Sequence, residues 1–416
     1  MDQRNSSSSS STPANAPSFA SPMIDAHPLA FTGSGGEYFR VWIVNVLLSI
    51  VTLGLYTPWA RRRTAQYFYG HTQVAGSPLE FTAPQGKMVK GFVLLVLIML
   101  AYNIAANTGQ DMAVALFLLA GAVLAPFIWA SAMRFRLSAT RWRGLRLQFA
   151  ASWREVYTAS WPVFALALVW FGVFVGLQVV TPEAVLDDET GRKMPQITAS
   201  MVALVALGLV LSVLCIIRLE YNYSSLLVLR SRLGQEPGRW KPIYLDFVRI
   251  WGATAIVFLL SVLALGALIS LAMHGGWLAL GKAPQLGMWL FVLIALAFVG
   301  GLLALFLASA PARAYREARM FQLLWDNIGV SQVARFKCDL GTGGYVWLRI
   351  RNLLLTLLTL GLYRPFARVS EYRMKTESVT LHVKGGVDQV AGTLVRQQDG
   401  GLGDALADAA GLDLIG

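Results

Sequence analysis

Near its start the chain reads Val41-Trp-Ile-Val-Asn-Val-Leu-Leu-Ser-Ile-Val-Thr-Leu-Gly-Leu-Tyr-Thr-Pro-Trp59, and near its end it reads Leu348-Arg-Ile-Arg-Asn-Leu-Leu-Leu-Thr-Leu-Leu-Thr-Leu-Gly-Leu-Tyr-Arg-Pro-Phe366. The two stretches align without a gap at a constant offset of 307 residues. Chance is a poor explanation for this match, so the sequence contains an internal repeat at its two ends. The copies share an asparagine (Asn45 and Asn352), a glycine (Gly54 and Gly361) and a proline (Pro58 and Pro365).

The second copy is too short to cross a membrane as a helix. Arg351 and Arg364 bracket it with only twelve residues between them, which cover about 18 Å of a hydrocarbon core that is roughly 30 Å thick. We therefore predict that both copies, about residues 33–70 and 341–375, are short re-entrant or interfacial helical elements with both ends cytoplasmic. The alternative is that both copies cross the membrane, which would give eight crossings. In either case a helix is expected to break near the repeated glycines and prolines, which would act as hinges: Gly54, Pro58, Gly361 and Pro365.

Between the repeats the sequence has the composition of a membrane protein. Of its 416 residues 56% are apolar and 14% are charged, whereas a soluble globular domain has about 25% charged residues. The expected fold is an all-α polytopic membrane protein in which six full transmembrane helices form three hairpins, with the two short repeat elements in addition. The six segments are long enough to cross a bilayer and have no charged residue in their interior: Met88–Ala106, Met112–Met133, Trp161–Val180, Ile197–Ile217, Trp251–Met273 and Leu286–Ala310.

Basic residues set the expected orientation. The short connections within the three hairpins, residues 107–111, 181–196 and 274–285, hold few Lys or Arg, whereas the long connections between hairpins are rich in them. Because Lys and Arg are retained in the cytoplasm, we expect a bacterial inner-membrane protein with both termini cytoplasmic. The net charge of +12 is then explained by basic loops beside anionic lipid, and nucleic-acid binding is the weaker alternative.

The cytoplasmic connections carry a second, shorter repeat. Thr72-x-x-x-Gly76-x-x-Leu79-x-Phe81 matches Thr140-x-x-x-Gly144-x-x-Leu147-x-Phe149, and looser echoes occur at Trp325–Lys337 and Thr376–Val383. A glycine-containing turn followed by alternation of apolar and polar residues is typical of a β-hairpin. We expect small β-hairpin elements at the cytoplasmic ends of the helices.

Three regions are expected along the chain. Residues 1–30 are rich in Ser and Pro and lack the apolar segment of a secretory signal, so they are predicted to be a disordered tail. Residues 31–388 form the multi-pass membrane domain, and residues 389–416 form a cytoplasmic C-terminal tail.

No group of residues predicts catalysis. The four histidines lack the spacing of metal ligands, Cys215 has no neighbouring histidine, and no phosphate-binding loop is present. We expect no enzymatic activity, no cofactor and no metal site.

Asn45 and Asn352 are the first candidate site residues. A carboxamide inside lipid is costly unless its hydrogen bonds are satisfied. Their equivalent positions predict either a pair that lines a polar path or contacts that hold helices together.

Two basic-aromatic faces are the second candidate. They could bind anionic lipid head groups, and the alternative is that they only determine topology. The first face is Arg61, Arg62 and Arg63 beside Tyr67, and the second is Arg141, Arg143 and Arg146 beside Trp142.

These motifs resemble the opening signature of the YjgN-like family, a family of bacterial inner-membrane proteins with a domain of unknown function. The resemblance covers about residues 31–388 and implies an inner-membrane location and a multi-pass architecture, without catalytic residues. The second copy departs from the pattern at Arg349, which replaces the aromatic residue of the first copy. The residues that carry the resemblance are Gly33-Ser-Gly-Gly-Glu-Tyr-Phe-Arg-Val-Trp-Ile-Val-Asn45, Thr52-Leu-Gly-Leu-Tyr56, Pro58-Trp-Ala-Arg61 and Tyr67-Phe-Tyr-Gly70.

Two classes of function fit these features. The first is passage of a small solute or lipid through the helical bundle, gated by the terminal elements, because paired broken segments mark binding sites in repeat-built transporters. The second is a membrane scaffold that holds anionic lipid or an envelope protein on its basic loops. Replacing Asn45 and Asn352 by leucine would abolish passage and leave a scaffold working.

Overall fold

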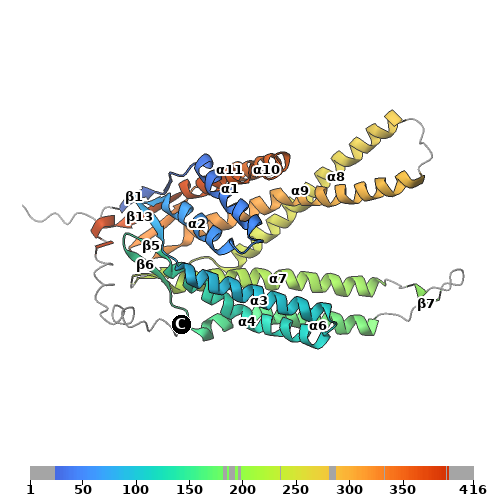
Figure 1. Cartoon of the computed structure of the whole chain (residues 1–416), viewed down its shortest axis with the longest axis horizontal. Coiled ribbons are helices and arrows are strands. Elements are labelled where there is room, and N and C mark those ends of the chain that lie inside the picture. Colours follow the sequence, from blue (N-terminus) through green and yellow to red (C-terminus); the bar gives the residue numbers. More distant parts are fainter. Residues whose placement is uncertain are drawn as a thin grey trace, which may run out of the picture.

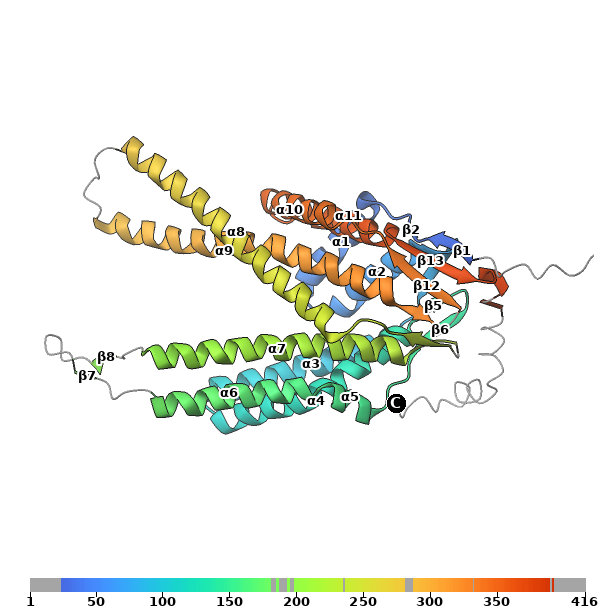
Figure 2. The same cartoon turned by 180° about the vertical axis from the view of Figure 1, so that it is seen from behind.

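The computed structural model describes residues 24–180, 185–186, 193–194, 198–234, 236–280, 287–331, 333–389 and 391–392. Most of the strands gather at one end of the molecule, and helices run away from them (Figure 1). The view from behind shows the same arrangement (Figure 2). The elongated molecule therefore has a β end and a helical end.

One supersecondary unit occurs five times in the described chain: a strand, a helical hairpin and a second strand that pairs antiparallel with the first. Unit 1 consists of β2 (Ala30–Phe31), α1 (Gly35–Val51), α2 (Thr57–Gly70) and β3 (Thr72–Val74). Unit 2 consists of β4 (Ser77–Phe81), α3 (Gln85–Asn107), α4 (Asp111–Ser138) and β5 (Thr140–Trp142).

The other three units follow the same plan. Unit 3 consists of β6 (Leu145–Phe149), α5 (Trp153–Ala159), α6 (Trp161–Val180), α7 (Ala199–Arg230) and β9 (Ser231–Leu233), with β7 (Val185–Leu186) and β8 (Lys193–Met194) between α6 and α7. Unit 4 consists of β10 (Glu236–Arg239), α8 (Tyr244–Leu280), α9 (Gly287–Asn327) and β11 (Gly329–Val330). Unit 5 consists of β12 (Ala334–Cys338), α10 (Thr342–Leu358), α11 (Arg364–Glu377) and β13 (Val379–Lys384).

Consecutive units are joined by tight turns between strands. Between β3 and β4 the turn residues Ala75 and Gly76 have φ angles of 47° and 74°, and between β5 and β6 Arg143 and Gly144 have 50° and 81°. Positive φ at both central residues is the type I′ geometry, whose twist matches that of a hairpin. The turns therefore link all units into one sheet, with the order β1-β13-β12-β11-β10-β9-β6-β5-β4-β3-β2.

The sheet is closed by one continuous segment of chain. β1 (Ile24–Pro28) pairs with β13, whereas β2 pairs with β3, and Leu29 alone separates β1 from β2. The Leu29 N–H also donates to the Val379 carbonyl at 2.9 Å. Residues 24–31 therefore hold both ends of the strand order, and the sheet curls into a nearly closed barrel.

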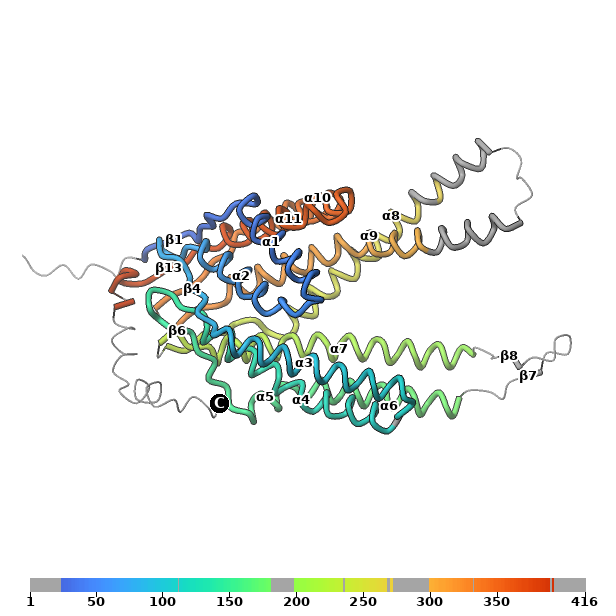
Figure 3. The backbone as a smooth tube through the Cα atoms, viewed as in Figure 1, coloured from blue at the N-terminus to red at the C-terminus, as the bar shows by residue number. Residues whose placement is uncertain are grey.

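The helical hairpins form a ring that continues the barrel. α2 contacts α3, α5 contacts both α4 and α7, α7 contacts α8, α9 contacts α10, and α11 contacts α1. Figure 3 shows the hairpins leaving the barrel side by side, with those of units 1 and 5 ending well before the others. Each unit therefore has the same two neighbours in the helical ring as in the barrel.

Units 2 to 4 supply the helices that can cross a membrane. In the described part of the chain five helices are long and apolar enough, and most of their residues are exposed to the surroundings. Exposed leucines and valines on every such helix are typical of contact with lipid. The five spans are Gln85–Asn107, Met112–Ser138, Trp153–Val180, Ala199–Arg230 and Tyr244–Ala267.

The predicted all-α fold with small β-hairpin elements is wrong. The hairpins join into one antiparallel sheet of eleven strands, because strands that are far apart in the sequence, such as β1 and β13, pair with each other. Five helices, and not six, qualify as spans among the described residues. The sixth predicted segment, 286–310, falls on α9, and the side chains of residues 286–298 lie outside the described part.

The sequence repeat corresponds to the helical hairpins of units 1 and 5. In each hairpin a leucine and a glycine turn the chain: φ is 48° at Leu53 and 88° at Gly54, and 51° at Leu360 and 94° at Gly361. Glycine adopts this left-handed geometry without strain, which explains why it is repeated. Each repeated proline stands in the first turn of the second helix, where its missing N–H leaves no intrahelical bond unmade.

Candidate functional site

The barrel encloses a cavity of about 660 Å³. In its middle, paired strands present side chains to the interior: Leu79 opposite Trp142, Leu147 opposite Leu233, and Phe336 opposite Leu381. Successive residues of a strand point to opposite faces, so most of the neighbouring polar residues face outward. The wall of the cavity is therefore mainly apolar, and Arg232 of β9 and Glu236 of β10 are the charged strand residues that also line it.

Each unit also closes the helical end of the cavity in the same way. The last turn of its second helix places one residue in the wall, and the residue three positions further on lies in the wall as well. The constant spacing gives the cavity an approximate fivefold repetition. The pairs are Tyr69 and Thr72, Leu137 and Thr140, Val228 and Ser231, Trp325 and Ile328, and Thr376 and Val379.

Hydroxyl groups in this wall are already satisfied by the protein. Thr72 Oγ1 donates to the Phe68 carbonyl at 2.7 Å, and Thr140 Oγ1 donates to the Arg136 carbonyl at 3.0 Å. Tyr372, whose pKa is raised by burial, lies 2.9 Å from Thr72 Oγ1 and donates to it. The hydroxyl hydrogens of these groups are used in hydrogen bonds within the chain, so these groups offer a ligand no free donor.

The charged side chains near the helical end of the cavity are paired. Lys375 lines the cavity and pairs with Glu317 of α9, and Arg349 pairs with Glu317 at 3.2 Å and also with Glu371. Burial raises the pKa of Glu317, but the hydrogen bond and charge of Lys375 and the charge of Arg349 outweigh burial and leave that pKa lowered. Glu317 is therefore ionised near neutral pH, and this network carries no net charge.

This network explains the departure of the second repeat at Arg349. Its cation stands at the position of Trp42 and ties α10 to α9 and α11 through two carboxylates. A charge that is paired in this way can be tolerated where the first repeat has an aromatic ring.

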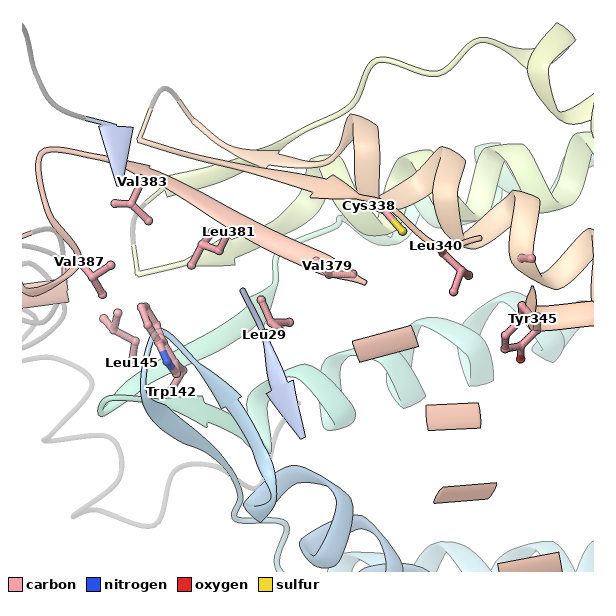
Figure 4. Close-up of a cluster of buried hydrophobic side chains, with 11 residues drawn as sticks. Leu29, Trp142, Leu145, Cys338, Leu340, Tyr345, Val379, Leu381, Val383 and Val387 are labelled. Atoms are coloured by element: carbon pink, nitrogen blue, oxygen red, sulfur yellow. The ribbon is translucent and has the colours of Figure 1, made fainter. Parts of the chain in front are cut away.

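Figure 4 shows side chains from both ends of the described chain in one buried apolar cluster. Leu29 lies beside Val379, and Leu381 and Val383 follow along β13 on the same side of the sheet. These four side chains are at most 8% exposed. The segment that closes the barrel is therefore also part of its apolar core.

Asn45 and Asn352 lie in equivalent places but outside the cavity wall. The Nδ2 group of Asn45 donates to the Ala60 carbonyl at 3.3 Å, and that of Asn352 donates to the Ala367 carbonyl at 3.3 Å. Each carboxamide thus joins the two helices of its own hairpin. The two residues form no hydrogen bond with each other in the described structure.

Asn352 is more deeply engaged than Asn45, which leads to a prediction. Its Nδ2 also donates to Ser370 Oγ at 3.0 Å and to Glu371 Oε1 at 3.1 Å. We expect Asn352→Leu to lower the free energy of unfolding by about 2 kcal/mol, because it leaves buried acceptors unpaired, and Asn45→Leu to lower it by about 1 kcal/mol. Thermal unfolding in detergent, followed by tryptophan fluorescence, measures both. Equal losses would contradict the assigned partners.

The predicted basic faces lie on different kinds of element. Arg61, Arg62 and Arg63 are on α2, and the first and third of them are exposed. Arg141 and Arg146 are paired across β5 and β6 in the barrel. Arg143 stands in the turn between these strands, where it donates to Ser77 Oγ at 2.8 Å and to the Ala75 carbonyl at 2.9 Å and pairs with Asp388.

The cavity residues were not identified as a site by sequence reasoning. The signal was present in the shorter repeat, whose apolar positions Leu79 and Leu147 both line the cavity. That repeat predicts hairpins, but a cavity follows only when all the hairpins close around one axis.

Comparison with known proteins gives a family and relatives. Residues 26–409 match the family described as bacterial protein of unknown function (DUF898). The chain is 29% identical over 159 residues to inner membrane protein YjgN of Salmonella typhimurium, and 30% identical over 148 residues to the protein of that name from Escherichia coli O157:H7. These matches cover 37% and 35% of this chain and only 39% and 36% of the relatives' lengths. No solved structure matches the chain.

Proposed function

The chain belongs to the DUF898 family of bacterial proteins of unknown function, and from that premise we propose that it is an inner-membrane protein that takes a lipid from the bilayer into its barrel. The single observation that carries the proposal is the mainly apolar cavity at the root of the helical ring. Of the two kinds of cargo expected from the sequence, a small solute or a lipid, this proposal selects the lipid.

The location and orientation rest on two supports. The relatives are named inner membrane proteins, and five helices of this chain are suited to crossing a bilayer. The strands of the barrel lie in the Lys- and Arg-rich connections, which are retained in the cytoplasm. The barrel is then cytoplasmic, and because β1 pairs with β13, both ends of the described chain are on that side.

The class of ligand follows from the wall of the cavity. Its volume of about 660 Å³ is in the range of sites that bury one small molecule, roughly 300–1,000 Å³. The hydroxyl groups of Thr72 and Thr140 and the ammonium group of Lys375 are satisfied by the protein. Apart from Arg232 and Glu236, the wall therefore offers a polar solute or ion few partners in exchange for its hydration. An acyl chain has no hydration to lose, and it exchanges the apolar contacts of the bilayer for those of the cavity wall.

The position of the cavity favours uptake from the membrane. Leu137, Val228 and Trp325 line it from the ends of α4, α7 and α9, the second helices of the three long hairpins. A ligand that leaves the bilayer along the ring axis would reach these residues first.

Filling the cavity tests the proposal. We expect the double variant Leu147→Trp, Leu233→Trp to retain about fivefold less lipid, because two indoles occupy the space of the ligand. Native mass spectrometry of purified, relipidated protein measures the retained lipid. Leu168→Trp is the matched control, since Leu168 is 70% exposed on α6 and should leave retention unchanged.

Two results would contradict this function. One is undiminished lipid in the filled barrel, and the other is absence of bound lipid from the relipidated parent protein. The melting temperature of the double variant in detergent is the control. A value close to that of the parent protein shows that the fold is intact and that lost retention is due to the filled cavity.

A second candidate function, a membrane scaffold that holds anionic lipid, is favoured by the exposed guanidinium groups of Arg61 and Arg63 close to the apolar tip of unit 1. Under this alternative the double variant Leu147→Trp, Leu233→Trp would still enrich anionic over zwitterionic lipid. The variant Arg61→Gln, Arg63→Gln would instead lose its enrichment for anionic over zwitterionic lipid.

A further inference from the structure

The hairpins of units 1 and 5 are the short ones, and they are neighbours in the ring. α1 and α10 have 17 residues each, about 26 Å at 1.5 Å per residue, whereas the 32 residues of α7 extend about 48 Å. α1 packs against α11, with Arg373 Nη2 donating to the Gly33 carbonyl at 2.7 Å. Two adjacent units of the five therefore end while the other three continue (Figure 3).

The tips of these two hairpins are apolar and uncovered in the described structure. Leu53 is 94% exposed and Leu360 is 95% exposed. They belong to a run of exposed apolar residues that includes Leu55, Leu358 and Leu362. An apolar patch of this kind favours contact with hydrocarbon. Bilayer lipid above the tips thus occupies the places that long hairpins occupy in units 2 to 4, and it borders the ring axis directly.

Arg364 stands beside one of these tips without a partner. It begins α11, three residues after Gly361, and it is exposed. Its guanidinium makes no hydrogen bond or ion pair in the described part of the chain, in contrast to the paired Arg349. An unpaired arginine at membrane depth calls for an anionic partner.

Arg364 stands at the same distance along its helix from the cavity as Arg313, which directly follows the apolar segment of α9 where head groups are expected. It lies fifteen residues before Val379, as Arg313 of α9 lies fifteen residues before Ile328, and both Val379 and Ile328 line the cavity. Arg313 bends back to its own helix, donating to Ser309 Oγ at 2.7 Å. Arg364 has no such contact, and so its planar fork is free to bind a phosphate in two-point fashion.

We infer that the paired tips of units 1 and 5 form the port through which a phospholipid leaves the barrel-side leaflet, and that Arg364 binds its phosphate there. This inference rests on the proposed function and names its substrate class.

The test compares two lipids and two arginines. Phosphatidylglycerol and diacylglycerol, each with the same diazirine-bearing chain, are incorporated in nanodiscs with the full-length protein. Photolabelling of the segment that contains Trp142 and Leu147 is followed by mass spectrometry. We expect Arg364→Gln to slow labelling by phosphatidylglycerol about fivefold and to leave labelling by diacylglycerol unchanged.

Arg351→Gln is the matched control, because Arg351 is also exposed on the same hairpin but lies farther from its tip. It should change neither rate. If both arginine variants label like the parent while the filled cavity does not, the port is wrong and the proposed function stands. If the parent protein itself shows no labelling in the barrel, the proposed function fails.

Discussion

Deletion of residues 2–29 is expected to open the barrel and to lower the free energy of unfolding by roughly 7 kcal/mol. The deletion removes β1, whose five residues pair with β13, at about 1 kcal/mol for each backbone hydrogen bond. It also removes Leu29, which is 8% exposed and contributes about 2 kcal/mol by burial. β13 would then become a free edge, which favours pairing with other chains.

Melting temperature and lipid retention in detergent measure this effect. Deletion of residues 2–22 is the control, because it removes no described residue, and it should behave as the full chain does. Recovery of both proteins from the membrane fraction shows that insertion is intact. A common melting temperature for the two deletions would show that residues 24–31 do not close the barrel.

Gly238→Val is expected to be the most damaging single substitution in the barrel wall. A Cβ atom at Gly238 would lie 2.1 Å from the Val228 carbonyl oxygen. A backbone atom at the end of α7 cannot move aside as a flexible side chain can, so β10 and α7 must separate. We expect a loss of about 3 kcal/mol or more and the loss of bound lipid with it.

The same substitution at Gly252 supplies the control. Gly252 lies in α8, and a Cβ atom built on it meets nothing within 4 Å. Gly252→Val should shift stability by no more than about 0.5 kcal/mol. Urea unfolding of both variants in the same detergent compares them, and equal stabilities would mean that β10 does not pack on α7 as described.

Particular elements show how far sequence reasoning reached. The terminal repeat was recognised from Asn45 and Asn352, and the structure gives these residues equivalent bonds to Ala60 and Ala367. The hairpins around Gly76 and Gly144 were recognised from turn residues and alternation, and both form. These features are local, because each is specified within a few dozen residues.

The candidate site was beyond that reach. The cavity is built from residues that lie up to about 360 positions apart, such as Leu29 and Val387, and no local pattern states that they share one space. Arg349 illustrates the same limit. From the sequence alone, the charge of Arg349 argued against an apolar environment. The structure shows that Glu317 and Glu371 pair with this charge.

By itself the sequence determined the family, the apolar helices, the short terminal repeats and the individual hairpins, since hydrophobic length, periodicity and turn chemistry act along the chain. Only the tertiary structure decided that the hairpins close into a barrel around an apolar cavity and that the two short units are neighbours. Strand pairing is made by backbone groups that every residue carries. The partner of an edge strand such as β1 is therefore selected by the geometry of the whole ring, and it cannot be predicted from the side chains of β1.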